Sequence, residues 1–247
     1  MAISDRMGVL REMRRQHLAQ LRLNCTMPER DKDGSASDSL AGSLRFLAVA
    51  DYVLDQNVSA FGQQLSEAAE FRLRLFERFD AGEAISPSYV SMMAYKSLLS
   101  ALASGNEAVV QALAARMGGR DAIELEYDRP FDRALGQCLK SILAKDVSTA
   151  QGALETFEQA CKEAENVDFK GYAKVLRCIL NGETHLLQEG FDEILTGHKR
   201  QCVGSGLFKD TEDEVLCVWG VGIANLARWN GLPAPASSEL LPVELIQ

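Results

Sequence analysis

The chain has 247 residues, of which 47% are hydrophobic and 25% charged, a composition typical of a folded globular protein and unlike a disordered segment. Its formal net charge of −9 disfavours direct binding to the phosphate backbone of nucleic acids. No stretch approaches the roughly 18–20 consecutive apolar residues of a membrane span, and the N-terminus lacks an apolar signal core. We therefore expect neither a nucleic-acid nor a membrane partner.

Cysteine and proline usage favours an intracellular helical protein. The six cysteines form no CxxC pair, and a chain of this length is not a small disulfide scaffold, so we expect free thiols in a reducing cytoplasm. Three of the six prolines fall in the last fifteen residues. A long stretch nearly free of proline suits α-helices, because proline removes a backbone donor and clashes with the preceding turn.

Residues 4–23 are predicted to form a basic amphipathic helix, with apolar residues at steps of three and four. Residues 1–30 carry six arginines against three acids, or +3, so the remainder carries −12. Such a helix either docks on the core, which we favour, or contacts a membrane or partner. Residues 24–38 are polar and rich in turn formers, and we expect a loop there.

Residues 39–80 are predicted to be helical, with a break near Asp55–Ser59 that separates two helices. Gly82 then interrupts the pattern. Ser86 precedes Pro87, an arrangement in which serine caps a helix and proline occupies its first position.

A weak internal repeat follows. Leucine pairs four residues apart, Leu98/Leu102, Leu139/Leu143 and Leu176/Leu180, each close a predicted helix, and their starts lie 41 and 37 residues apart. A polar or glycine turn and a second helix follow each pair, at Glu107–Met117, Ser148–Lys162 and Thr184–Cys202. This spacing predicts antiparallel hairpins stacked as an irregular α-solenoid, with a less regular bundle as the alternative. The expected fold is all-α, with about ten helices.

The remaining segments complete a single predicted domain. Ala122–Tyr127 alternates apolar and charged residues with period two, so we expect a loop or a brief extended segment. Thr211-Glu-Asp-Glu214 matches a capping box that starts a last helix, which ends at Trp229 before an Asn230-Gly231 cap. The predicted parts are an N-terminal helix and loop (1–38), stacked hairpins (39–231) and an extended C-terminal strap (232–247).

The sequence contains few candidates for chemistry. There are three histidines, His17, His185 and His198, and no nucleophile or metal motif accompanies them. His198 and Cys202 are spaced four apart, but two ligands do not make a zinc site. Gly220, Gly222 and Ala224 are expected to allow close helix packing rather than to bind phosphate. We predict no catalytic residue, no metal and no cofactor; an enzyme with an unfamiliar site would depend on His185 or His198.

Carboxylates are the candidate partner contacts. Glu155, Glu158 and Glu165 recur along one predicted helix, and Asp168 follows. They form either a solvated face or a surface that mimics phosphate charge and docks on a basic partner. Trp219 and Trp229 project roughly 80° apart on the last helix and are expected to share a core face.

The C-terminal third resembles a family of all-helical immunity proteins, immunity family forty-nine, encoded beside polymorphic and type VI-secreted bacterial toxins. The resemblance lies in Leu226-Ala-Arg228 with Gly231-Leu232, and in Leu241-Pro242 with Leu245. It implies an immunity protein that binds and neutralises a cognate toxin, often a nuclease with a basic cleft. The alternative is a helical-repeat adaptor or secretion chaperone that binds a peptide segment.

Overall fold

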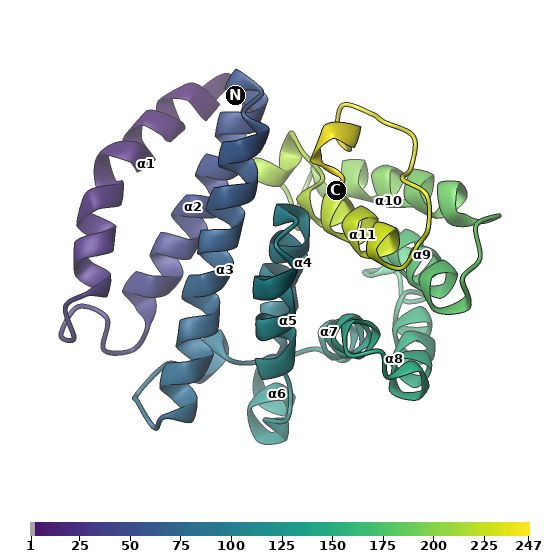
Figure 1. Cartoon of the computed structure of the whole chain (residues 1–247), viewed down its shortest axis with the longest axis horizontal. Helices are drawn as coiled ribbons and strands as arrows, with labels where there is room; N and C mark the ends of the chain where they lie inside the picture. The colour runs from purple at the N-terminus through teal and green to yellow at the C-terminus, as the bar shows by residue number, and fades with distance from the viewer. Residues whose placement is uncertain (1–2) are drawn as a thin grey trace.

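The computed structural model describes residues 3–247 and is all-helical over that range, which confirms the predicted fold class. Eleven α-helices are present, against about ten expected, together with five short 3-10 helices, η1–η5 (Figure 1). Within the described residues the β contact is limited to an isolated bridge between Ser238 and Leu241. The α-helices are α1 (Ile3–Cys25), α2 (Ser35–Asp55), α3 (Val58–Asp80), α4 (Tyr95–Ser104), α5 (Glu107–Arg116), α6 (Asp121–Tyr127), α7 (Pro130–Leu143), α8 (Val147–Ala160), α9 (Lys170–Asn181), α10 (Leu187–Gln201) and α11 (Val218–Trp229).

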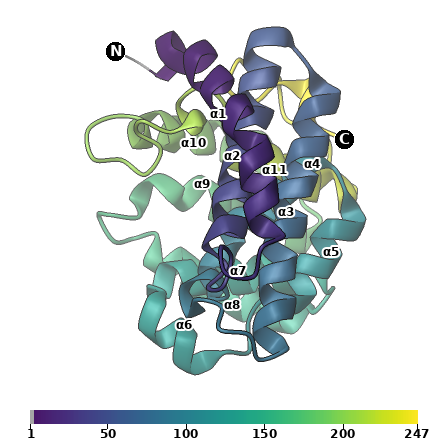
Figure 2. The same cartoon turned by 90° about the vertical axis from the view of Figure 1, so that its left-hand side faces the viewer.

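The N-terminal helix α1 docks along α2, as Figure 2 shows, which confirms the favoured interpretation of this segment. Ile3 and Met7 enter the main core. The arginines of α1 face acids of the neighbouring helices: Arg15 donates to buried Asp51 of α2 at 2.7 Å, and Arg22 pairs with Glu67 of α3. Most of the basic charge of this helix is therefore paired with acids of the same chain, whereas Arg14 lies over the ring of Phe46.

The second helix begins at Ser35, four residues before the expected start, so the predicted loop 24–38 is too long. Gly34 supplies a left-handed turn with φ of 86° directly before the helix. The buried carboxylate of Asp31 accepts hydrogen bonds from the backbone and hydroxyl of Ser37, at 2.9 and 2.6 Å. These contacts fix the first turn of α2 in a segment whose composition alone indicates a loop.

The predicted break between two helices is confirmed, since α2 ends at Asp55 and α3 begins at Val58. The predicted cap at Ser86 is only half right. Pro87 does occupy the first position of a helix, but this is the three-residue 3-10 helix η1 (Pro87–Tyr89), and the Ser86 side chain makes no capping hydrogen bond.

The three repeats correspond to the helix pairs α4/α5, α7/α8 and α9/α10, whose members contact one another. α8 also packs on α9, so the second and third pairs are stacked as predicted. The last helix α11 returns to pack on α4 as well as α9 (Figure 1). This return closes the stack into an irregular bundle, the second of the two arrangements expected.

Close packing of α11 on α4 depends on small residues, as expected for Gly222. A Cβ atom at Gly222 would lie 2.2 Å from the carbonyl oxygen of Leu99. Buried Asn225 reinforces the contact by donating to the carbonyl of Leu102 at 2.8 Å. Trp219 is buried and Trp229 half-buried, so the two tryptophans share the core-facing side of α11.

Two local predictions are wrong. Residues 121–127 form helix α6 instead of an extended segment. Ile123 packs against the core, whereas Leu125, two residues later, is 66% exposed. The alternating apolar residues therefore do not share one buried face, as they would in a strand. Thr211 starts only the single 3-10 turn η4 (Glu212–Glu214), and the α-helix begins at Val218. The chain bends there because the carboxylates of Glu212 and Asp213 turn toward Arg45 of α2.

The C-terminal segment forms the expected strap, ending in η5 (Val243–Leu245). Leu241 and Leu245 are buried, and the backbone of Cys217 donates to the carbonyl of Leu240 at 2.9 Å. Tyr52 of α2 donates to Glu244 at 2.6 Å, so the strap ties the end of the chain to the N-terminal helices.

Candidate functional site

A cleft opens where α2, α3 and α4 meet the segment 202–217 and the start of α11. Its volume is about 280 Å³, close to the lower end for a small-molecule site. The lining side chains combine small or aromatic residues with three cations, Arg45, Arg72 and Lys96. We treat this cleft as the candidate functional site because it is concave and concentrates polar groups.

The deep wall of the cleft is aromatic. Phe208 and Trp219 are each 3% exposed, and their rings meet edge to face with centroids 5.1 Å apart. Tyr95 lies behind Trp219 at 5.5 Å, and His198 packs against Phe208 at 4.7 Å. These ring contacts hold the wall rigid and present an apolar surface to anything in the cleft.

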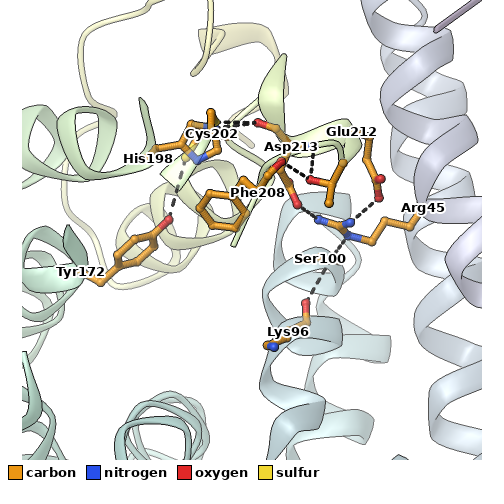
Figure 3. Close-up of polar contacts among 11 residues, drawn as sticks. Arg45, Lys96, Ser100, Tyr172, His198, Cys202, Phe208, Glu212 and Asp213 are labelled. Carbon is orange, nitrogen blue, oxygen red and sulfur yellow. Dashed lines mark hydrogen bonds and ion pairs between the residues drawn. The ribbon is translucent and has the colours of Figure 1, made fainter. Parts of the chain in front are cut away.

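Arg45 closes one side of the cleft. Figure 3 shows its guanidinium between Glu212 and Asp213, with which it forms ion pairs, while its Nε donates to the Ser100 hydroxyl at 3.1 Å. Burial alone would lower the pKa of Arg45, but attraction to Asp213 and Glu212 outweighs it and raises that pKa. Arg45 is therefore a fixed, fully paired cation.

The guanidinium of Arg72 is also bound to groups of the protein itself. It pairs with Asp38 and donates to the carbonyl of Tyr89 at 3.0 Å. The two carboxylates that line the cleft, Asp38 and Asp213, are thus each matched by an arginine.

Lys96 differs from the other two cations. It is half-buried on α4, and among residues 3–247 no carboxylate lies within ion-pair distance, 4.0 Å, of its ammonium group. Burial lowers the pKa of Lys96, because desolvation disfavours the charged form. The neighbouring hydroxyl of Ser97, also half-buried, has no hydrogen-bond partner among the described residues.

The histidines considered for chemistry are not assembled into a site. His185 is exposed, with 68% of its side chain accessible. His198 is 2% exposed, and its Nε2 donates to the carbonyl of Asp213 at 2.7 Å. Cys202 is close to the same carbonyl, at 3.9 Å. In the part of the chain that the structure describes, no group of three or more histidine, cysteine or acidic residues is placed to hold a metal ion.

The four predicted partner contacts fall into two kinds. Glu155 and Glu165 are exposed, Glu165 lying 3.9 Å from Arg129. Glu158 is half-buried and accepts two hydrogen bonds from Arg177, at 2.6 and 2.5 Å. Asp168 is mostly buried and bonds Arg200 and Gln201, at 3.2 and 2.9 Å. A partner that used Glu158 or Asp168 would have to displace these internal bonds.

Glu155 belongs to a set of exposed carboxylates that have no basic group within ion-pair distance in residues 3–247. They come from α5, α6, α8 and the turn after α8: Glu107, Asp121, Glu126, Glu155 and Glu163. The acidic excess is spread along the chain, since residues 31–106, 107–165 and 166–247 each carry a net charge of −4. The carboxylates of α5, α6 and α8 are therefore one part of a generally acidic surface.

The sequence-based search missed the cleft. Its lining comes from positions 38 to 219, and no local pattern joins them. One signal was available: Arg45 interrupts the apolar run Leu44–Ala50, and Lys96 stands between apolar residues 92–95 and 98–99. A charge inside an apolar helical run indicates either a buried ion pair or a site.

Comparison with known proteins adds no relatives: no protein-family model, curated protein or solved structure matches the chain. No helix in the described range 3–247 has both the length and the apolar character needed to cross a membrane.

Proposed function

We propose that this protein acts by binding another protein, as a cytoplasmic immunity protein that neutralises a cognate secreted bacterial toxin. The observation that carries the proposal is the set of exposed carboxylates between Glu107 and Glu163 that no basic side chain of the described residues neutralises. The resemblance of the C-terminal segment to immunity proteins supports the same function.

The expected partner is a toxin domain with a basic cleft, as in a nuclease. Unpaired surface carboxylates attract such a partner from a distance and increase the association rate. Among the four contacts predicted from sequence, Glu155 on α8 and Glu165 on the following turn are accessible for this role, and Glu163 lies on that same turn. We therefore propose that this end of α8 contacts the toxin.

The test is rescue of a bacterium that expresses the toxin encoded by the adjacent gene. We expect the full chain to restore growth and to form a one-to-one complex that salt weakens. The triple variant Glu155→Gln/Glu163→Gln/Glu165→Gln should slow association about tenfold at low salt. The matched control is Glu29→Gln/Glu77→Gln/Glu239→Gln, which removes three exposed carboxylates elsewhere and should leave the rate within about twofold.

An absence of protection by the wild-type chain, with the toxin active and both proteins present, would refute the proposal. Capture of short linear segments only, with no folded toxin domain bound, would instead support the adaptor or chaperone alternative.

A further inference from the structure

Lys96 is a half-buried cation without a direct ion pair: its ammonium lies 6.0 Å from the centre of the Tyr95 ring, and the carboxylate of Asp132 attracts it only from beyond ion-pair distance. Its side chain is half-buried on α4 at the wall of the cleft, whereas Arg45 and Arg72 are held by Asp213, Glu212 and Asp38. Taking an ammonium group out of water is costly unless an opposite charge compensates it. Within residues 3–247, no carboxylate does so at ion-pair distance, which leaves a position for an anion beside Lys96.

The space next to Lys96 is shaped for an apolar group. Phe208 and Trp219 form the deep wall, and Ala41, Gly42 and Ala69 leave the opposite side open because their side chains are small. A second hollow of about 400 Å³, lined by Tyr89, Met93 and Tyr127, shares Arg72, Lys96 and Ser97 with the cleft. Lys96 and Ser97 therefore border both hollows, and both side chains are partly exposed.

We propose that this cleft binds a small carboxylic acid, whose carboxylate pairs with Lys96 and accepts a hydrogen bond from Ser97, and whose apolar part lies against Phe208 and Trp219. The site is distinct from the proposed toxin surface and does not depend on it. The charge count favours a monoanion over a phosphate. Of the three cations that line the cleft, Arg45 and Arg72 are already in salt bridges and Lys96 is not, so the cleft offers one positive charge to a ligand.

The test uses 3-phenylpropionate and its neutral counterpart 3-phenylpropanamide, titrated into the full-length protein. Trp219 lines the cleft, so binding should change its fluorescence; a Trp229→Phe background removes the other tryptophan signal. Calorimetry provides a second readout. We expect the acid to bind saturably, at least tenfold more tightly than the amide, and less tightly as salt increases.

Three variants separate the contributions. Lys96→Gln removes the charge and should weaken binding of the acid at least tenfold while leaving the amide within twofold. Lys199→Gln, which changes an exposed lysine on α10 outside the cleft, is the matched control and should change neither. Gly42→Leu fills the cleft from α2, where a Cβ atom meets nothing within 4 Å, and should abolish binding of both probes while Lys96 stays in place.

Equal affinity for acid and amide, an unchanged affinity of Lys96→Gln, or binding that persists in Gly42→Leu would each overturn the proposal, as would an acid that does not bind at all. Circular dichroism and the melting temperature of each variant establish that it is folded. Lys96→Gln should melt no lower than the wild-type protein, because the substitution removes a half-buried charge without an ion-pair partner.

Discussion

His198 is an interior residue that folding keeps neutral. Its ring is 2% exposed, and burial lowers its pKa to about 4 from the usual 6.5, against the opposing effect of its hydrogen bond to the Asp213 carbonyl. Between these two values the unfolded chain binds a proton that the folded chain does not, so acidification favours unfolding. The stability linked to His198 is complete above pH 6.5 and is lost as the pH falls toward 4.

The first prediction follows from that difference. Between pH 7 and pH 5 the free energy of unfolding should fall by about 2 kcal/mol on account of His198, at about 1.4 kcal/mol per pH unit below 6.5. Urea titrations at a series of pH values should show that His198→Gln lacks this part of the dependence of the unfolding free energy on pH. His185→Gln, at an exposed position, is the control and should keep the wild-type slope. Identical slopes for wild type and His198→Gln would show that His198 is not buried in solution.

At the scale of single helices, substitution of glycine by alanine should have opposite effects on stability at closely packed and at open positions. Gly222→Ala places a methyl group against the Leu99 carbonyl, 2.2 Å away, and should destabilise the protein by about 2 kcal/mol. Gly152→Ala in α8 meets nothing within 4 Å and should stabilise it by about 0.5–1 kcal/mol through helix propensity. Chemical denaturation measures both; equal effects would contradict the close crossing of α11 and α4.

The success of sequence-based prediction also varies at this scale. The leucine pairs Leu139/Leu143 and Leu176/Leu180 marked helix ends correctly because helix periodicity and turn residues are local properties. Residues 121–127 were mispredicted because seven residues are too few to separate a period of two from 3.6 when one apolar side chain faces outward. The start of α11 was misplaced because Arg45, more than 160 residues away in sequence, fixes the preceding turn.

The candidate site as a whole could not be predicted, for a related reason, although the charges of Arg45 and Lys96 inside apolar runs marked two of its residues. Its lining residues are brought together by four helices and the segment before α11, so the cleft exists only in the folded chain. The acidic character of the surface was predictable from composition. Which carboxylates are accessible was not, because Glu158 and Asp168 find basic or amide partners across helix pairs.

Across the whole molecule, the two ends of the chain are joined by polar contacts over a continuous core. One buried cluster includes residues from Ile3 to Leu245. Arg45 connects α2 to η4, Tyr52 connects α2 to the strap, and Asn225 accepts from the backbone of Gln247 at 2.7 Å while donating to α4. The contacts of Arg45 hold the segment 202–217 against α2 at the cleft, whereas those of Tyr52 and Asn225 hold the strap and α11 in place.

Among these polar contacts, we expect those of Arg45 to contribute most to the stability of the protein. In Arg45→Met, Glu212 and Asp213 would face each other without their cation, and Ser100 would lose its donor. Breaking a buried pair from one side leaves desolvated charge, so we expect a loss of about 3 kcal/mol in urea denaturation. The triple variant Arg45→Met/Glu212→Gln/Asp213→Asn removes the stranded charges as well and should recover more than half of that loss, because replacing a whole buried pair is often nearly neutral. If Arg45→Met costs less than about 1 kcal/mol, the Arg45 ion pairs do not hold η4 against α2, and the cleft does not owe its shape to them.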